Sequence, residues 1–174
     1  YLRQLKAKNN IVPLGTTSET PNIESENLET SEYEKIIQIA KSAIDEHRRN
    51  NPNSKELLIA GVGSNSTKQA IKFTNLAAEL GADAGMSVTP YYNKPNQEEH
   101  LDHQKAVAQV GLPIMVYDVP PRCGGIGLLP ETISRMSEVE NIVALKAAVN
   151  VDDKLTQILL NKRDGFTVLS GNDS

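Results

Sequence analysis

Polar side chains that could do chemistry follow or end short apolar runs in this sequence. Threonines follow the first run, tyrosines follow the third and end the fourth, and a lysine ends the fifth. In chain order the set is Thr16, Thr17, Tyr91, Tyr92, Tyr117, Arg122, Lys146, Asn172 and Asp173. If the runs are parallel strands, these residues share the carboxyl edge of one sheet, where α/β folds place their active sites.

Lys146 ends an apolar run that spans residues 142–145, and Ala147-Ala148-Val149 follows it. Apolar surroundings lower the pKa of a lysine because burial disfavours its charged form, and the free amine can then attack a carbonyl carbon. The pattern is therefore compatible with a Schiff-base lysine. The alternative is an ordinary lysine with its ammonium at the rim, and position alone favours this alternative because most lysines are exposed.

Four further residues have both a chemical and a structural interpretation. Tyr117 could carry a proton, since a phenol both donates and accepts, or it could be a core tyrosine whose hydroxyl reaches the edge. Thr16 and Thr17 could hydrogen-bond a carboxylate or could serve turn chemistry. Arg122 could bind a carboxylate through its forked guanidinium, or it could form a surface ion pair. The residues alone leave these alternatives open.

Two other patterns carry weaker chemical signals. His100 and His103 share a helical face with Glu99, but the set lacks a third convincing ligand, so no metal site is predicted. Gly61-Val62-Gly63 is not a dinucleotide-binding fingerprint, because Ser66 occupies the place of the third glycine.

The elements that must position these residues alternate between short strands and amphipathic helices. Residues 1–8 read as the end of a helix, and strands are predicted at residues 11–14, 57–62, 84–89, 113–119, 142–146 and 166–169. Helices are predicted from a Ser31–Glu34 capping box, from Ser66 with Gln69 to Gly81, from Asn96 with Glu99 to Gly111, from Pro130 to about Glu138, and from Asp152 to Lys162. Strict alternation indicates a parallel sheet, either open and doubly wound or closed as a (β/α)8 barrel. A complete barrel takes about 250 residues, so a barrel of this length would lack both ends.

Composition disfavours several other classes of function. The 174 residues carry a formal net charge of −4, which argues against nonspecific nucleic-acid binding. No apolar run is long enough to cross a bilayer, so no membrane partner is predicted. Cys123 is the only cysteine and has no evident histidine partner, which disfavours a disulfide and a catalytic thiol and fits a reducing, cytoplasmic location. The chain opens at Tyr1 in the middle of a helical pattern, and we expect its true N-terminus to lie further upstream.

Five short segments complete the sequence evidence. They are Gly15-Thr16-Thr17-Ser18-Glu19, Val88-Thr89-Pro90-Tyr91-Tyr92-Asn93-Lys94-Pro95, Tyr117-Asp118-Val119-Pro120-Pro121-Arg122, Leu145-Lys146 and Ser170-Gly171-Asn172-Asp173. In order and spacing they resemble the dihydrodipicolinate synthase / N-acetylneuraminate lyase family, and the second segment is close to the synthase branch. In that family the lysine forms a Schiff base. The resemblance favours the catalytic interpretation of Lys146 and Tyr117.

The resemblance implies a (β/α)8 TIM barrel, present over residues 1–174 as one partial barrel domain that covers about strands 2 to 7. Lys146 would form an imine with pyruvate, and Tyr117 would shuttle protons. Thr16 would link Tyr117 to Tyr92, which in the family reaches into a neighbouring subunit. The expected substrate-binding residues are Thr17, Arg122, Gly171 and Asn172, with Thr17 on the pyruvate carboxylate and Arg122 on the carboxylate of aspartate semialdehyde.

The activity implied is that of a lyase of lysine and diaminopimelate biosynthesis, which joins pyruvate and L-aspartate 4-semialdehyde into 4-hydroxy-tetrahydrodipicolinate. No metal or organic cofactor is implied, because the imine is the electron sink, and the full-length protein would be a homo-oligomer, a dimer or a tetramer. Other pyruvate-dependent aldolases (4-hydroxy-2-oxoglutarate aldolase, N-acetylneuraminate lyase) or an inactive truncated barrel are the alternatives. Arg122 favours the synthase, because it suits a short acidic aldehyde.

The sequence departs from the family pattern at three positions. Ser18 replaces a glycine, Asp118 replaces an asparagine, and Ala147 replaces an acidic residue. The segment between Glu19 and Leu57 is also longer than usual in bacterial members. These departures concern the fine tuning of the site, since each proposed catalytic group is retained.

Overall fold

The structure, a computed structural model, describes residues 11–14, 28–125, 127–149 and 153–171. Its strands are β1 (Ile11–Leu14), β2 (Leu57–Gly61), β3 (Ala84–Val88), β4 (Ile114–Asp118), β5 (Ile142–Ala147) and β6 (Thr167–Ser170). Its helices are α1 (Thr30–Asn50), α2 (Thr67–Glu79), α3 (Gln97–Ala108), α4 (Pro130–Ser137) and α5 (Asp153–Asn161), with a short 3-10 helix η3 (Pro120–Arg122) before α4. The predicted strands are confirmed to within one residue at each end. The helix expected at residues 1–8 lies outside the described residues.

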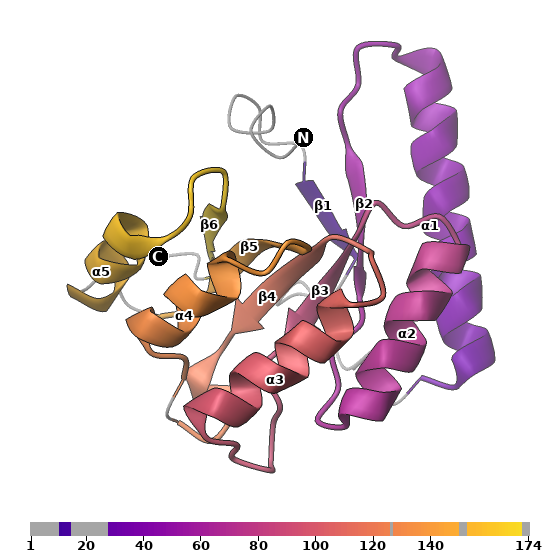
Figure 1. The fold of residues 1–174 in the computed structure, drawn as a ribbon. Helices are drawn as coiled ribbons and strands as arrows, with labels where there is room; N and C mark the ends of the chain where they lie inside the picture. The colour runs from indigo at the N-terminus through magenta and orange to yellow at the C-terminus, as the bar shows by residue number, and fades with distance from the viewer. Residues whose placement is uncertain (1–10, 15–27, 126, 150–152, 172–174) are drawn as a thin grey trace.

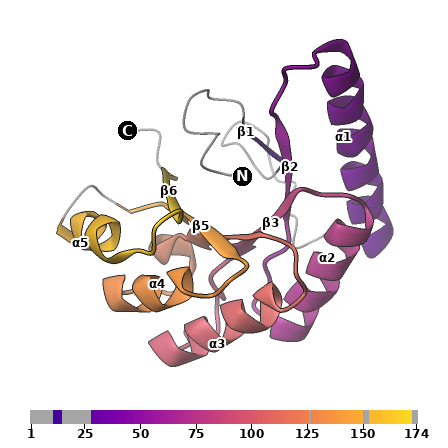
Figure 2. The same ribbon diagram turned by 45° about the horizontal axis from the view of Figure 1, so that its top comes forward.

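The six strands form one parallel sheet in the sequential order β1-β2-β3-β4-β5-β6. A doubly wound sheet would reverse its strand order at a switch point and carry helices on both faces. Here the order never reverses, and the five helices lie on one side of the sheet (Figures 1 and 2). The structure therefore decides between the two predicted architectures in favour of a partial (β/α)8 barrel.

Alternate residues of each strand divide the interior into two packed regions. The larger region lies between sheet and helices and includes Val116 of β4, Leu145 of β5 and Ile133 of α4. The smaller lies on the opposite face, where Met115 and Ala144 pack with side chains from β2 and β3. Since Tyr117 and Lys146 follow Met115 and Ala144 by two residues, they belong to this helix-free face.

Capping residues explain where the helices begin, and one predicted cap is wrong. Helix α1 begins two residues earlier than the Ser31–Glu34 box predicts, because Glu29 is its N-cap and Glu32 Oε2 accepts from Glu29 N at 2.9 Å. The Asn96–Glu99 box before α3 is confirmed with both reciprocal hydrogen bonds, at 3.0 and 2.8 Å. Ser66 accepts from the backbone N–H of Gln69 at the start of α2, and Pro130 opens α4, as predicted.

A three-way contact holds the end of α1 against the sheet. Arg48 Nη2 donates to Asp83 Oδ2 at 2.8 Å and also to the carbonyl oxygen of Glu56, just before β2. Asp83 Oδ2 accepts from Leu58 N at 2.8 Å as well, so one carboxylate joins α1, β2 and the start of β3. Charged groups placed in this way add directional contacts to a helix whose buried face packs through apolar side chains.

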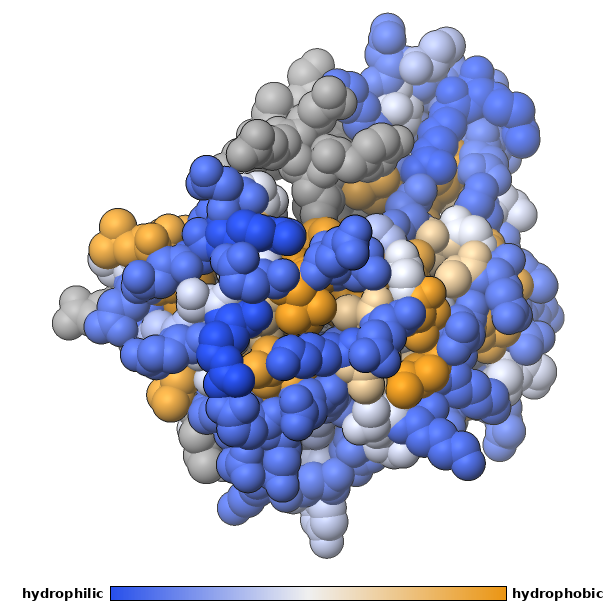
Figure 3. Space-filling view, viewed as in Figure 1, coloured by the Kyte–Doolittle hydropathy of each residue, from blue (hydrophilic) through white to orange (hydrophobic). Residues whose placement is uncertain are grey.

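The helix-bearing face is largely hydrophilic, with apolar patches between the helices and at the side where α5 lies (Figure 3). Leu159 and Leu160 of α5 are 50% and 78% exposed. In the part of the chain that the structure describes, no helix combines the length and the apolar character that crossing a membrane requires.

Candidate active site

Lys146 and Tyr117 face each other across the β4–β5 strand pair. They are register partners, and Lys146 Nζ lies 4.4 Å from the centroid of the Tyr117 ring. Both project from the helix-free face near the carboxyl ends of their strands, above the apolar side chains of Met115 and Ala144. The structure thus brings together the predicted amine and the predicted proton carrier.

Tyr117 and Lys146 are both half-buried between apolar register partners. Lys146 has Leu169 of β6 as its other register partner, and Tyr117 has Val88 of β3. Burial raises the pKa of the Tyr117 phenol, Arg122 opposes this rise through its positive charge, and Cys123 adds to it. A phenol with a raised pKa keeps its proton at neutral pH, so Tyr117 can donate to an oxygen or nitrogen held beside Lys146.

Arg122 lies at the same end of the sheet, in η3 directly after β4. Its side chain is exposed, and its positive charge partly opposes the rise that burial causes in the pKa of the Tyr117 phenol. The next residue, Cys123, is buried, and its thiol donates to the carbonyl oxygen of Thr89 at 3.1 Å. Cys123 therefore ties the Arg122 segment to the end of β3.

Tyr92 is not brought onto the Lys146–Tyr117 pair. Its side chain is 90% exposed, and its backbone has a positive φ of 67°. A non-glycine residue in this left-handed region carries strain on the order of 1–3 kcal/mol, and such strain gathers at functional sites. Tyr91, half-buried, precedes it.

Gly171 follows β6 directly and lies close to β5. Its N–H donates to Ala147 O at 2.8 Å, and a Cβ at this position would come within 3.1 Å of Ala148. A side chain at this position would therefore fit only if Ala148 moved by a few tenths of an ångström. Thr16, Thr17, Ser18 and Asn172 lie outside the described residues.

Asp118 has a role that sequence reasoning missed. Its side chain is only 1% exposed, accepts from Leu128 N at 3.2 Å, and lies 3.4 Å from Lys154 Nζ of α5. Burial raises the pKa of this carboxyl, while Lys154 and the Leu128 N–H oppose the rise. Asp118 is also the register partner of Ala147, so two of the three departures from the family pattern are neighbours. The sequence signal was a carboxylate at the end of an apolar strand.

The two histidines of α3, His100 and His103, are packed inside the fold. Both are buried, and His103 Nδ1 lies 2.8 Å from Thr67 Oγ1 of α2. Among the described residues, no group of three or more metal-ligating side chains is gathered in one place.

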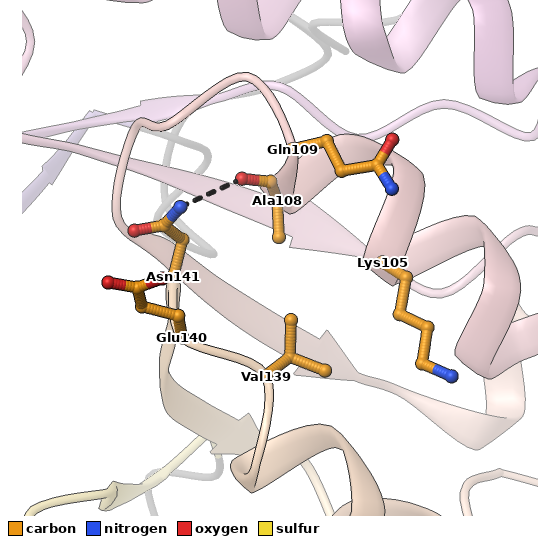
Figure 4. A pocket seen from close by; sticks show the side chains of 6 residues that line it. All are labelled: Lys105, Ala108, Gln109, Val139, Glu140 and Asn141. Atoms are coloured by element: carbon orange, nitrogen blue, oxygen red, sulfur yellow. Dashed lines mark hydrogen bonds between the residues drawn. The ribbon is translucent and has the colours of Figure 1, made fainter.

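One surface pocket lies away from the Lys146–Tyr117 pair. It is lined by the last turns of α3 and by the residues that precede β5, which are Lys105, Ala108, Gln109, Val139, Glu140 and Asn141 (Figure 4). Asn141 Nδ2 donates to Ala108 O across it at 3.2 Å. Because the pocket is at the amino ends of the strands, it is not part of the candidate site.

Comparison with known proteins identifies the family. Residues 6–174 match the model of the dihydrodipicolinate synthetase family. The 4-hydroxy-tetrahydrodipicolinate synthase of Citrifermentans bemidjiense is 44% identical over 164 residues, which cover 94% of this chain and 52% of that protein. The corresponding synthase of Pelagibacter ubique is 39% identical over 166 residues, or 95% of this chain and 52% of that protein. The chain thus spans about half the length of these relatives.

Solved structures agree with the sequence comparison. A dihydrodipicolinate synthase from Bacillus anthracis superposes with a TM-score of 0.77 and 39% identity, over 86% of this chain and 48% of that one. The enzyme from Cyanidioschyzon merolae, solved with lysine bound, also gives 0.77, with 37% identity and the same coverage. Sequence match, fold and the facing lysine and tyrosine lead to one conclusion: the chain belongs to the dihydrodipicolinate synthetase family.

Proposed function

We propose that the protein is a class I aldolase-type lyase that condenses pyruvate with L-aspartate 4-semialdehyde to 4-hydroxy-tetrahydrodipicolinate. The observation that carries this proposal is the position of Lys146 Nζ, 4.4 Å from the Tyr117 ring centroid at the carboxyl end of β4 and β5. Relatives named as this synthase, 38–44% identical, support the choice of reaction.

The proposed reaction begins when the neutral amine of Lys146 attacks the keto carbon of pyruvate. Water leaves, an imine forms, and loss of a methyl proton gives the enamine, with the imine nitrogen as electron sink. The enamine carbon then attacks the aldehyde carbon of the second substrate. Attack of the substrate's own amine on the imine carbon closes the ring and releases Lys146. Tyr117 carries protons between these steps, which its protonated phenol permits.

Arg122 is proposed to bind the carboxylate of the semialdehyde. Its exposed side chain lies directly after β4, and its charge reaches Tyr117. Thr17, Gly171 and Asn172 are proposed to contact substrate, with Thr17 on the pyruvate carboxylate, and Thr16 to connect Tyr117 with Tyr92. A homo-oligomer is proposed in which Tyr92 serves a neighbouring subunit. The 90% exposure and left-handed backbone of Tyr92 support this role, because they hold the ring out into solvent.

Trapping of the imine tests the proposal. The intact protein is incubated with pyruvate, reduced with borohydride, digested and mapped by mass spectrometry. The adduct is expected on Lys146 and is expected to vanish in Lys146→Ala. Lys105→Ala, a change in the pocket at the opposite end of the sheet, is the matched control and should keep the adduct.

Two outcomes would contradict the proposal. An adduct that persists in Lys146→Ala, or that maps to Lys94 or Lys154, would remove the assigned nucleophile. An adduct on Lys146 combined with turnover of 4-hydroxy-2-oxoglutarate or N-acetylneuraminate, but not of aspartate semialdehyde, would keep the imine chemistry and replace the second substrate.

A further inference from the structure

The segment 119–129, which joins β4 to α4 and carries Arg122, is held near its far end by the side chain of Gln97. Gln97 is the first residue of α3. Its Nε2 donates to Gly127 O at 2.9 Å, and its Oε1 accepts from Leu129 N at 2.9 Å and from Thr132 Oγ1 at 2.7 Å. A single side chain therefore satisfies backbone groups on both sides of Leu128.

Asp118 accepts from the backbone amide of Leu128, which Gln97 does not contact. Its carboxylate is itself held by Lys154 of α5. The carbonyl of Gly127 and the amides of Leu128 and Leu129 are thus all bound by side chains from other elements. In a strand or helix, these backbone groups would be hydrogen-bonded by other backbone groups. Here they depend on the side chains of Gln97 and Asp118.

The near end of the segment is held independently. The thiol of Cys123 donates to Thr89 O, and the N–H of Arg122 donates to Val119 O at 3.0 Å. Arg122 therefore lies between the carboxyl end of β4 and Cys123, which is anchored. Gln97 and Asp118 hold residues 127–129, which lead into α4. Gln97 also begins the helix that follows Tyr92, so it joins the two loops that carry predicted site residues.

We propose that Gln97 and Asp118 are positioning residues that hold segment 119–129, and with it the guanidinium of Arg122, in the place where the substrate carboxylate binds. The inference rests on the proposed function of Arg122. Because these contacts hold a loop through side chains and are not part of the hydrogen-bond ladder of the sheet, their loss should loosen the segment while the sheet and the Lys146–Tyr117 pair stay in place. The kinetic consequence is a weaker hold on the acidic aldehyde, with imine formation unaffected.

The test uses Gln97→Ala in the intact protein, with Gln109→Ala as matched control. Gln109 is an exposed glutamine at the other end of the same helix. Hydrogen–deuterium exchange of the peptide that spans 119–132 is expected to quicken about tenfold in Gln97→Ala, since the segment loses the bond that protects Leu129 N–H and the bond that holds Gly127 O. The KM for aspartate semialdehyde is expected to rise about tenfold, less than in Arg122→Ala because the guanidinium is still present. The kcat, the KM for pyruvate and the borohydride-trapped adduct should match those of Gln109→Ala.

Conservative variants separate positioning from general damage. Gln97→Glu keeps the acceptor for Leu129 N and Thr132 but loses the donor to Gly127 O, so its exchange rate and KM should fall between wild type and Gln97→Ala. Asp118→Asn keeps an acceptor for Leu128 N and removes the charge that faces Lys154. Because the contact with Leu128 N is kept, the KM for the aldehyde should stay closer to wild type than in Gln97→Ala, and the adduct should be retained.

The results distinguish this inference from the proposed function. If Arg122→Ala raises the KM for the aldehyde and Gln97→Ala does not, the positioning role is wrong and the function stands. If exchange quickens in Gln97→Ala but Arg122→Ala leaves that KM unchanged, the contacts hold the segment but not a substrate-binding arginine, and the inference falls together with the role of Arg122. If Gln97→Ala also loses the pyruvate adduct, Gln97 supports the whole site and the proposal is overturned.

Discussion

His103 should make the folded protein sensitive to acid. The side chain is 5% exposed, between α3 and α2, and its Nδ1 is hydrogen-bonded to Thr67 Oγ1. Burial lowers its pKa from 6.5 to about 4, with a smaller contribution from the neighbouring His100. The pKa of His100 is also lowered by burial, although the charges of Asp118 and Glu99 oppose this change.

The sign of the effect follows from comparing the folded and unfolded chains. Between pH 6.5 and about 4, the unfolded chain binds a proton at this histidine and the folded chain does not. The stability is therefore fully present above pH 6.5 and is lost as the pH falls toward 4. Each pKa unit corresponds to about 1.4 kcal/mol, so His103 alone should remove about 3 kcal/mol of unfolding free energy across this interval.

Urea unfolding of wild type and His103→Asn at a series of pH values from 7 to 4.5 measures this loss. Asparagine places an amide near the position of Nδ1, where it can keep the contact with Thr67 without titrating. Carboxylates contribute equally to both proteins, so the difference between their pH slopes isolates His103. A direct NMR titration of the His103 ring gives the same quantity independently. Equal slopes, or a ring that titrates near 6.5, would refute the reasoning.

Two further predictions concern single arginines. Arg48→Ala should lower the unfolding free energy by about 1–3 kcal/mol, because it removes the cation from Asp83 and a donor from the Glu56 carbonyl, whereas exposed Arg49→Ala should change it by less than about 0.5 kcal/mol. Equal losses in urea unfolding of the two variants would contradict the role given to the Arg48 contact. Arg122→Ala should weaken transition-state binding of aspartate semialdehyde by about 2–5 kcal/mol, seen in steady-state kinetics as a rise in its KM far above that for pyruvate. Equal changes for both substrates would indicate a general structural role.

The sequence by itself determined the strands and the order of the elements. Apolar runs such as 57–62 and 142–146 agree with β2 and β5 to within one residue. These properties depend on local periodicity, capping and strand-end position, which neighbouring residues encode. The expectation that Lys146 and Tyr117 lie at one edge follows from the same logic. The local pattern is a weaker guide where two possible N-caps lie within a few residues of each other. Here the sequence favours the Ser31–Glu34 box, whereas Glu29 is the N-cap of α1.

Only the tertiary structure decided which residues meet across long intervals of chain. The sequence left a doubly wound sheet and a barrel open, because strand order depends on where each helix packs. It also gave no reason to join Gln97 to Leu129 or Asp118 to Lys154, which are 32 and 36 residues apart. Such contacts depend on two backbones being brought within hydrogen-bond distance. The residue types of the site can therefore be predicted from the sequence. The contacts proposed to position Arg122 form only when the strands pair and bring α3, β4 and α5 together.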